Sequence, residues 1–226
     1  MILTKKNVSN EKLYVFKINE NLEHYIERAK SIIDNSKKIT EASANNSVDP
    51  FSHINQKLET HEETYQSKIE KHNSNSLLSN PELEGLYSWF QECINFVMKD
   101  LGLEKEELEI THSWGNKFDK LKFSERHTDK NSLITGIFIL SNTENKNIFL
   151  RYERSVWYKM MLNHGDSRNW YADLGAGQLI LFPSSVPHGT TPGKESENPL
   201  YTISFNTFLK GSRKQNLNYK EIETSI

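Results

Sequence analysis

The sequence has one cysteine, no long hydrophobic run and almost no net charge. A lone Cys93 excludes an intramolecular disulfide, which is typical of a reducing compartment and predicts a cytoplasmic location. No window approaches the roughly 18 consecutive apolar residues of a membrane span, and no secretory signal is visible, so we expect no membrane partner. Lys and Arg total 28 against 30 Asp and Glu, a balance that argues against nucleic acid as a partner.

The first part of the chain predicts two helices and a strand that support a larger unit. A strand-like run over 12–18 is followed by an amphipathic helix. Residues 38–80 are rich in Ser, Asn, Glu and Lys, which is typical of a polar insertion, a loop or a lid with sparse helix. A second helix is predicted over 80–102, where Asn80 can cap it, and its apolar stripe places Cys93 in the core.

From about residue 107 the hydrophobic period changes from that of helices to that of strands. Turn residues separate most of the predicted strands, which span 108–117, 121–128, 132–141, 147–154, 169–174, 177–183, 186–191 and 199–209. Eight short strands after two helices favour a mainly β fold, a double-sheet jelly roll or cupin-like barrel with flanking helices packed outside. We therefore predict one domain over 1–226, with support over 1–106, a jelly-roll core over 107–211 and a tail over 212–226. The apolar connection 155–168 is expected to cover the barrel mouth.

A triplet and a distant histidine predict a metal centre. His127 and Asp129 are two apart, so on an extended strand their side chains point to the same side. His188 follows 188 − 129 = 59 residues later, preceded by Pro187 and about four strands on. Two imidazoles and one carboxylate are the ligand set of non-haem Fe(II) sites, which leave one face of the metal open. The competing interpretation is two unrelated surface or loop histidines.

Several blocks in a fixed order make the sequence recognisable. They are Ser113-Trp114-Gly115-Asn116, His127-Thr128-Asp129, Leu133-Ile134-Thr135-Gly136-Ile137-Phe138, Gly177-Gln178-Leu179-Ile180-Leu181-Phe182-Pro183-Ser184, and Pro187-His188 with Ile203-Ser204-Phe205-Asn206-Thr207-Phe208. Over roughly 107–211 the chain resembles the prolyl-hydroxylase-like 2-oxoglutarate–Fe(II) oxygenases of marine bacteria and cyanophages. The N-terminal half matches only loosely.

The resemblance implies a reaction and a role for each ligand. The fold would be a double-stranded β-helix that holds Fe(II) through His127, Asp129 and His188. 2-Oxoglutarate would be the cosubstrate and dioxygen the oxidant. Oxidative decarboxylation of 2-oxoglutarate would drive oxidation of a bound small-molecule or peptide substrate. A retained carboxylate at Asp129 implies hydroxylation, because Gly or Ala there would leave room for a halide.

The chain departs from the family at the start of its last strand. The family has an Arg there that pairs with the distal carboxylate of 2-oxoglutarate, and this chain has Leu200. A strand carrying Arg151 and Arg154 could supply the cation instead. Use of a different 2-oxo acid, or loss of turnover, would equally explain the departure. Thr202 and Ser204 share the face of Leu200 by alternation, so either hydroxyl is a candidate cosubstrate contact or a small core residue.

Two further functions stay open beside a 2-oxoglutarate-dependent oxygenase. A cupin-type metal enzyme that does not use 2-oxoglutarate would explain the missing Arg. A non-enzymatic binding protein that keeps the fold would use the polar segment 38–80 as an arm. Trp114, in the first family-like block, is expected to be a core residue. His112, just before that block, is given no role.

Overall fold

The structure is a computed structural model. It describes residues 2–8, 11–39, 63–66, 77–118, 124, 126–141, 148–152, 168–172, 174–191 and 198–210. The helical elements are η1 (Glu20–Leu22), α1 (His24–Asn35), η3 (Leu77–Ser79), η4 (Pro81–Leu83) and α2 (Glu84–Asp100). The strands are β1 (Ile2–Val8), β2 (Glu11–Lys17), β3 (Lys37–Ile39), β4 (Glu63–Gln66), β5 (Leu108–Phe118), β6 (Ile134–Ile139), β7 (Ile148–Tyr152), β8 (Arg168–Ala172), β9 (Gln178–Pro183), β10 (His188–Thr190) and β11 (Leu200–Leu209).

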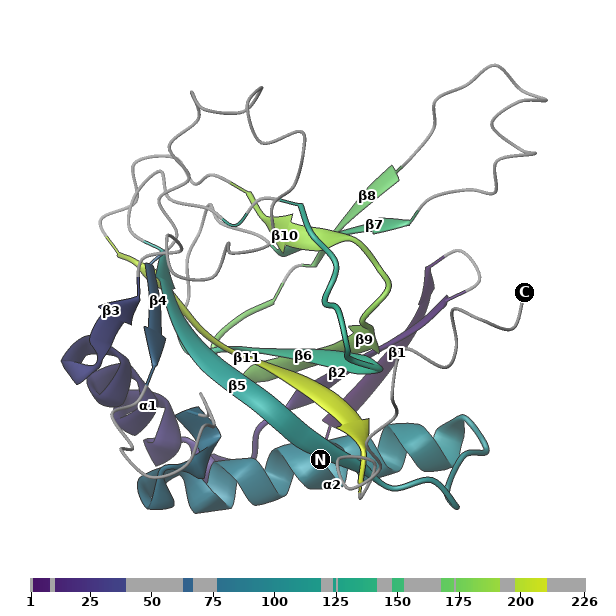
Figure 1. Ribbon diagram of the computed structural model, residues 1–226, viewed down its shortest axis with the longest axis horizontal. Coiled ribbons are helices and arrows are strands. Elements are labelled where there is room, and N and C mark those ends of the chain that lie inside the picture. Colours follow the sequence, from purple (N-terminus) through teal and green to yellow (C-terminus); the bar gives the residue numbers. More distant parts are fainter. Residues whose placement is uncertain are drawn as a thin grey trace, which may run out of the picture.

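The strands form two antiparallel sheets. The larger sheet has the order β1-β2-β9-β6-β11-β5-β4-β3, and the smaller has the order β10-β7-β8. Helices α1 and α2 lie along one face of the larger sheet, and the smaller sheet lies on its opposite side (Figure 1). This arrangement confirms the predicted mainly β fold with flanking helices.

Strict alternation along the strands of the larger sheet divides the core in two. On β11, Ile203 and Phe205 belong to the cluster that packs against the helices, while Leu200 belongs to the cluster between the sheets. The same alternation separates Phe138 on the helix side of β6 from Ile137 on the barrel side. The barrel interior is therefore lined by the residues that alternate, along each strand, with those facing the helices.

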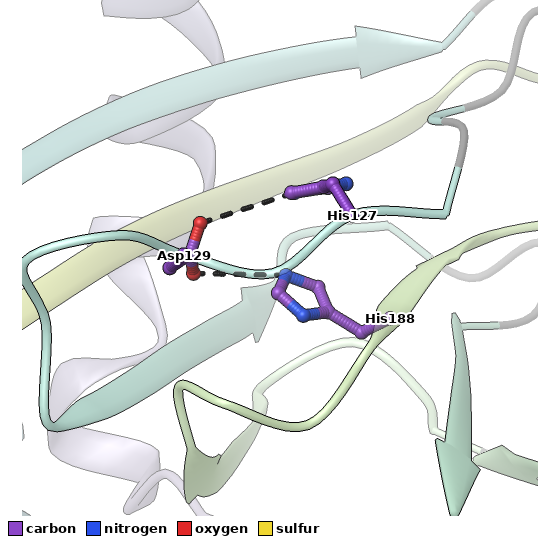
Figure 2. Close-up of side chains that lie close together, drawn as sticks. All are labelled: His127, Asp129 and His188. Carbon is purple, nitrogen blue, oxygen red and sulfur yellow. Dashed lines mark ion pairs between the residues drawn. The ribbon is translucent and has the colours of Figure 1, made fainter. Parts of the chain in front are cut away.

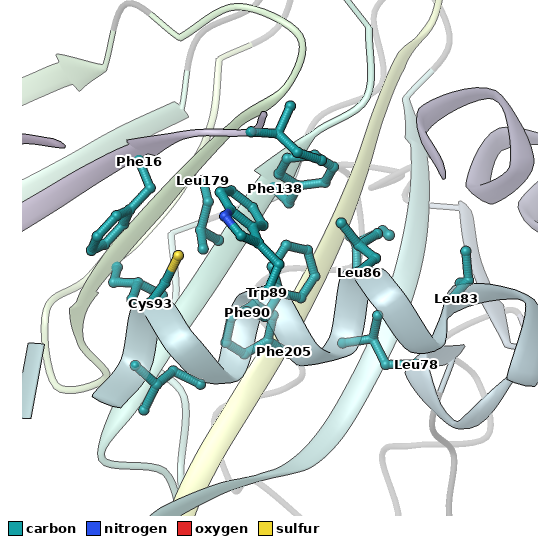
Figure 3. Packing of buried hydrophobic residues seen from close by; sticks show 14 of the residues in the cluster. Phe16, Leu78, Leu83, Leu86, Trp89, Phe90, Cys93, Phe138, Leu179 and Phe205 are labelled. Atoms are coloured by element: carbon teal, nitrogen blue, oxygen red, sulfur yellow. The ribbon is translucent and has the colours of Figure 1, made fainter. Parts of the chain in front are cut away.

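Helix α2 covers the sheet with one apolar face. Its buried residues recur every three or four positions, as expected for a helix with one packed side; they are Leu86, Trp89, Phe90, Cys93, Ile94, Val97 and Met98. Phe90 stacks on Phe205 with ring centroids 5.0 Å apart and contacts Phe138 edge-on at 5.2 Å (Figure 3). The predicted core position of Cys93 is confirmed.

The predicted capping role of Asn80 is confirmed at the start of the helical segment, where Asn80 caps η4. Helix α2 itself begins after Leu83, which makes no side-chain cap. The side chain of Asn80 accepts a hydrogen bond from the backbone N–H of Glu82 at 2.9 Å, where η4 begins. At the other end Gly102 has φ 72°, and the N–H of Leu103 donates to the carbonyl of Met98 at 2.8 Å. A glycine with positive φ, followed by this backbone hydrogen bond, is a common C-terminal capping motif of helices.

The prediction of a strand over 121–128 is wrong for the described part of that range. Residues 124 and 126–128 contain no extended strand, and His127 makes only an isolated bridge to His188. The segment stays irregular because its backbone turns to follow β10 at one point and the β9 end at another. The other seven predicted barrel strands are present, with ends shifted by a few residues.

Three strands were not predicted. β1 pairs along its whole length with β2, and β3 and β4 extend the far edge of the larger sheet beside β5. β4 and most of β3 lie within the predicted polar insertion, so part of that insertion belongs to the sheet. The predicted cover over 155–168 lies outside the described residues except for Arg168, the first residue of β8.

Candidate metal centre

Backbone hydrogen bonds bring the two halves of the predicted ligand set together. The N–H of His127 donates to the carbonyl of His188 at 2.9 Å, and the N–H of His188 donates back at 2.8 Å. The N–H of Asp129 donates to the carbonyl of Ser184 at 3.2 Å, which ties the triplet to the end of β9. Residues far apart in the chain are thus fixed beside one another by the main chain alone.

The three predicted ligands converge. Asp129 faces both histidines, with Oδ1 3.9 Å from His127 Nε2 and Oδ2 3.6 Å from His188 Nε2 (Figure 2). One ligand atom from each residue lies within 4.8 Å of the other two. Small side-chain rotations would bring all three atoms onto one ion, because metal–ligand bonds to such atoms are about 2.0–2.2 Å long. Two imidazoles and a carboxylate suit Fe(II) and leave part of its coordination sphere open.

His188 is held in the form that binds metals. Its Nδ1 lies 3.0 Å from the carbonyl oxygen of Val186, and because a carbonyl only accepts, Nδ1 carries the proton. Nε2 is then a free lone pair that faces Asp129. Burial lowers the pKa of His188 and the neighbouring His127 lowers it further, against the opposing effect of Asp129. A neutral imidazole needs no proton removed before it coordinates an ion.

Hydroxyl groups behind Asp129 orient its carboxylate. Thr135 Oγ1 donates to Asp129 Oδ2 at 2.5 Å and also lies 2.9 Å from Ser184 Oγ. Ser184 Oγ in turn donates to Ser132 Oγ at 2.7 Å. Thr135 and Ser184 are both 1% exposed, so this chain of hydroxyls is shielded from solvent. Partners of this kind fix the rotamer of a metal-binding carboxylate.

The three candidate ligands lie on the wall of a cavity between the two sheets. Its empty volume is about 400 Å³, including the open mouth, and the other lining residues are Trp114, Asn116, Phe118, Ser124, Thr135, Ile137, Ile148, Gly189, Thr190, Thr202 and Ser204. No Lys or Arg is among these described residues. Thr202 and Ser204, which the sequence left as candidate cosubstrate contacts or small core residues, both line this cavity.

Leu200 itself is 2% exposed and belongs to the apolar cluster between the sheets. Arg151 lies in β7, where its backbone pairs with Asn169, and Arg154 lies outside the described residues. The assignment of either arginine to the cosubstrate stays a prediction.

Trp114 corrects a prediction made from the sequence. It belongs to neither buried cluster, is only half-buried and lines the cavity, so the expectation of a core residue is wrong. It shares its face of β5 with His112, whose ring centroid is 5.4 Å away, and with Asn116. The physical reason is alternation on β5, which directs residues 112, 114 and 116 toward the barrel mouth and interior.

Thr135 is a site residue that the sequence did not single out, and Asn116 was only a weaker candidate in the family-like block that contains Trp114. Thr135 lies six residues after Asp129 in a block that reads simply as a buried strand. Asn116 lies two residues from Trp114, and strand alternation would have placed it on the cavity side once β5 was oriented. What was missing is the pairing between strands, which sequence periodicity does not give.

Residues 112–206 match a family model described as "Putative 2OG-Fe(II) oxygenase". The matched range begins in β5 and ends in β11, so it contains the three candidate ligands and most of the cavity wall. The resemblance predicted from the sequence is confirmed, and with it the class of enzyme, for this part of the chain. No curated protein matches the sequence.

Solved structures of known oxygenases share the fold. A prolyl-4-hydroxylase from Pseudomonas putida has a TM-score of 0.53 at 11% identity, over 88% of this chain and 94% of that one. A prolyl hydroxylase from Trichoplax adhaerens, in complex with a peptide fragment of hypoxia inducible factor, has a TM-score of 0.56 at 12% identity, over 87% and 83%. HygX from Streptomyces hygroscopicus, with nickel and 2-oxoglutarate bound, has a TM-score of 0.55 at 10% identity, over 86% and 82%. The likeness confirms the predicted double-stranded β-helix.

None of the helices within the described ranges has the length and apolar character needed to cross a membrane.

Proposed function

We propose that this chain is an Fe(II)- and 2-oxoglutarate-dependent oxygenase that hydroxylates a small molecule or a peptide, with His127, Asp129 and His188 as the iron ligands. The observation that carries the proposal is the convergence of these three side chains within 4.8 Å, inside the range that matches the oxygenase family. The bound metal, together with its cosubstrate, would supply the activation of dioxygen.

The protein's own residues prepare the site before anything binds. Thr135 fixes the carboxylate of Asp129, and the Val186 carbonyl fixes the tautomer of His188. His127 is the outermost ligand, with 44% of its side chain exposed against 4% for His188. Iron would therefore enter from the side of His127 and reach the two buried ligands last.

The substrate class is proposed from the related folds. The Trichoplax adhaerens enzyme was solved with a peptide, and HygX was solved with hygromycin B. Half-buried Trp114 on the cavity wall would give either kind of substrate a flat apolar surface. We also propose that the chain forms a single domain. Its one cysteine is free and buried, which is typical of a reducing compartment, so we place the protein in the cytoplasm.

Iron binding and cosubstrate turnover test the proposal together. Protein loaded anaerobically should hold one Fe(II), and with dioxygen and 2-oxoglutarate it should form succinate. His127→Ala, Asp129→Ala and His188→Ala should each lower iron affinity by more than the roughly 10- to 100-fold typical of losing an outer partner. His24→Ala, on the exposed side of α1, is the matched control and should keep the iron. Unchanged iron content in the three variants, or bound iron without succinate, would refute the proposal.

One observation favours a second candidate, a cupin-type metal enzyme that does not use 2-oxoglutarate. Leu200 is buried among apolar side chains where the family has its anchoring Arg. Oxygen consumption by the iron-loaded protein with substrate, in the absence of any 2-oxo acid, would support this candidate over the first.

A further inference from the structure

A buried polar group without a hydrogen-bond partner among the described residues lies on the wall of the cavity that also holds the metal ligands. The Nδ2 group of Asn116 donates to Thr202 Oγ1 at 3.0 Å and to Ser204 Oγ at 3.1 Å. Its Oδ1 is buried and has no hydrogen-bond partner among the described residues, although the residue is only 3% exposed. Buried polar atoms are normally paired, so an unpaired one beside a cavity indicates that something else completes it.

The three side chains can present donors to a ligand in two ways. Both hydroxyls accept from Asn116, so each still has its own proton to donate into the cavity. Alternatively the amide turns about its Cβ–Cγ bond, and Oδ1 then accepts from both hydroxyls while the NH₂ group faces the cavity. Either arrangement satisfies Thr202 and Ser204 and offers neutral N–H or O–H donors.

Further along β5 and β11 from the metal ligands, past the paired residues Asn116 and Thr202, the cavity wall is apolar. Phe118 and Ile148 line it, and Leu200 is packed in the same cluster at the start of β11. No described lining residue carries a positive charge. Along β11 the wall therefore changes from Asn206, paired with Thr135 beside Asp129, through the neutral donors Ser204 and Thr202, to apolar Leu200.

We propose that Asn116, together with Thr202 and Ser204, holds the distal end of a 2-oxo acid cosubstrate through neutral hydrogen bonds. The site would consequently accept 2-oxo acids with uncharged tails about as well as 2-oxoglutarate. This inference rests on the proposed function, since the 2-oxo acid is bound at the metal formed by His127, Asp129 and His188.

This expectation follows from how charged and neutral sites differ in their response to a ligand without a distal carboxylate. A site with a buried arginine rejects a ligand that lacks the distal carboxylate, because the arginine is then left unpaired. A site of hydroxyls and an amide is not left with a buried charge by such a ligand. Neutral hydrogen bonds also compensate a distal carboxylate less fully for the hydration that it loses on binding.

The decisive measurement compares two ligands that differ only at the distal end. Ni(II)-loaded protein, which holds the metal without turnover, is titrated calorimetrically with 2-oxoglutarate and with 2-oxopentanoate. We expect dissociation constants within about tenfold of each other, whereas a charge-assisted anchor would favour 2-oxoglutarate by about 10- to 150-fold. A preference for 2-oxoglutarate above about tenfold in the wild-type protein overturns the inference without any variant.

Variants then identify the residues responsible. Asn116→Asp keeps the shape but adds a negative charge, so it should weaken 2-oxoglutarate more than tenfold and 2-oxopentanoate by less than about threefold. Asn95→Asp, on the exposed face of α2, is the matched control and should change neither. Leu200→Arg should restore a preference for 2-oxoglutarate. If Asn116→Asp does not fold, Thr202→Val and Ser204→Ala remove the same donors one at a time.

The outcomes separate this inference from the proposed function. Nickel binding without binding of any 2-oxo acid would refute the use of a 2-oxo acid, and the inference with it. Strong selectivity for 2-oxoglutarate that is lost in Arg151→Ala or Arg154→Ala, but not in Asn116→Asp, would leave the proposed function intact and assign the anchor to a cation instead.

Discussion

Asp129 is the residue on which the candidate metal centre depends most directly. Each of its carboxylate oxygens faces a different histidine, and Oδ2 also accepts from Thr135 at 2.5 Å. Its side chain is only 9% exposed, so water does little to orient it. The geometry of the three ligands is therefore set by the hydroxyl of a residue that would not itself touch the metal.

Thr135→Val tests this dependence. The change keeps the shape of the side chain and removes the donor to Asp129, so we expect metal affinity to fall by about 10- to 100-fold. Isothermal titration with Ni(II) measures the change. Thr135→Ser keeps the hydroxyl and should bind metal within about threefold of the wild-type protein, because the donor remains. Equal losses in the two variants would show that packing around Thr135, and not its hydrogen bond, is what matters.

Cys93 gives a second prediction at this scale. Burial raises the pKa of its thiol to about 12, and the charge of Glu92 adds to the effect. The thiol is the protonated, unreactive form below that pKa, so the folded protein should not react with a disulfide reagent at pH 8. We expect labelling only when urea unfolds α2, at the rate of global opening. Rapid stoichiometric labelling of the native protein would contradict the buried position.

Residue spacing predicted the three ligands but not their supporting residues. His127, Asp129 and His188 were identifiable because a metal requires those side-chain types in a recognisable order. Thr135 and Asn116 are ordinary strand residues whose roles come from the strands beside them, and register between strands is not encoded in periodicity. Trp114 was misplaced for the same reason, since its large apolar ring reads as core until the face of β5 is known.

At the scale of elements, the larger sheet packs against a separate apolar cluster on each of its two faces. Where β6 passes β11, Gly136 lies directly opposite Phe205 in the register. A Cβ at Gly136 would overlap the ring of Phe205, which is itself stacked on Phe90 of α2. The glycine thus allows the close approach of β6 to an aromatic ring that fixes the helix on the sheet.

Gly136→Ala should therefore destabilise the protein through overpacking, by about 1–3 kcal/mol or more. Urea unfolding followed by circular dichroism gives the free energy. Adding Phe205→Leu should recover part of the loss, so the two changes should be non-additive. Gly102→Ala is the comparison, because nothing lies within 4 Å of its Cβ position and only its φ of 72° opposes the change. Its cost should be about 1 kcal/mol. Additive losses for Gly136 and Phe205 would contradict the proposed clash.

The elements predicted from the sequence are those with a strong internal period. The segment of η4 and α2 has an Asn cap, a terminal Gly102 and one apolar face, and β9 is a continuous apolar run. β1 contains two adjacent lysines and a terminal valine, and it becomes a strand by pairing with β2 along its length. In the range 121–128 alternation is present in the sequence, but among the described residues only His127 forms a β-bridge, and that bridge is isolated.

At the scale of the whole molecule, the candidate centre joins the two sheets. His188 belongs to β10 of the smaller sheet, while Asp129 is tied through Ser184 to the end of β9 in the larger one. A metal held by both residues would be a cross-link between the sheets in the folded state only. Ligands that bind only the folded state stabilise it by mass action.

Thermal unfolding should show this coupling. With Ni(II) at 100 times its dissociation constant, the folded state should gain about 2.7 kcal/mol. For a chain of this length, each kcal/mol raises Tm by about 2–4 °C, so we expect a rise of roughly 5–10 °C by calorimetry. Asp129→Ala should abolish the rise, and His24→Ala should keep it, because His24 lies on the exposed side of α1. An equal rise in Asp129→Ala would mean that nickel binds elsewhere, and the two sheets would then be joined by their apolar core without help from the metal.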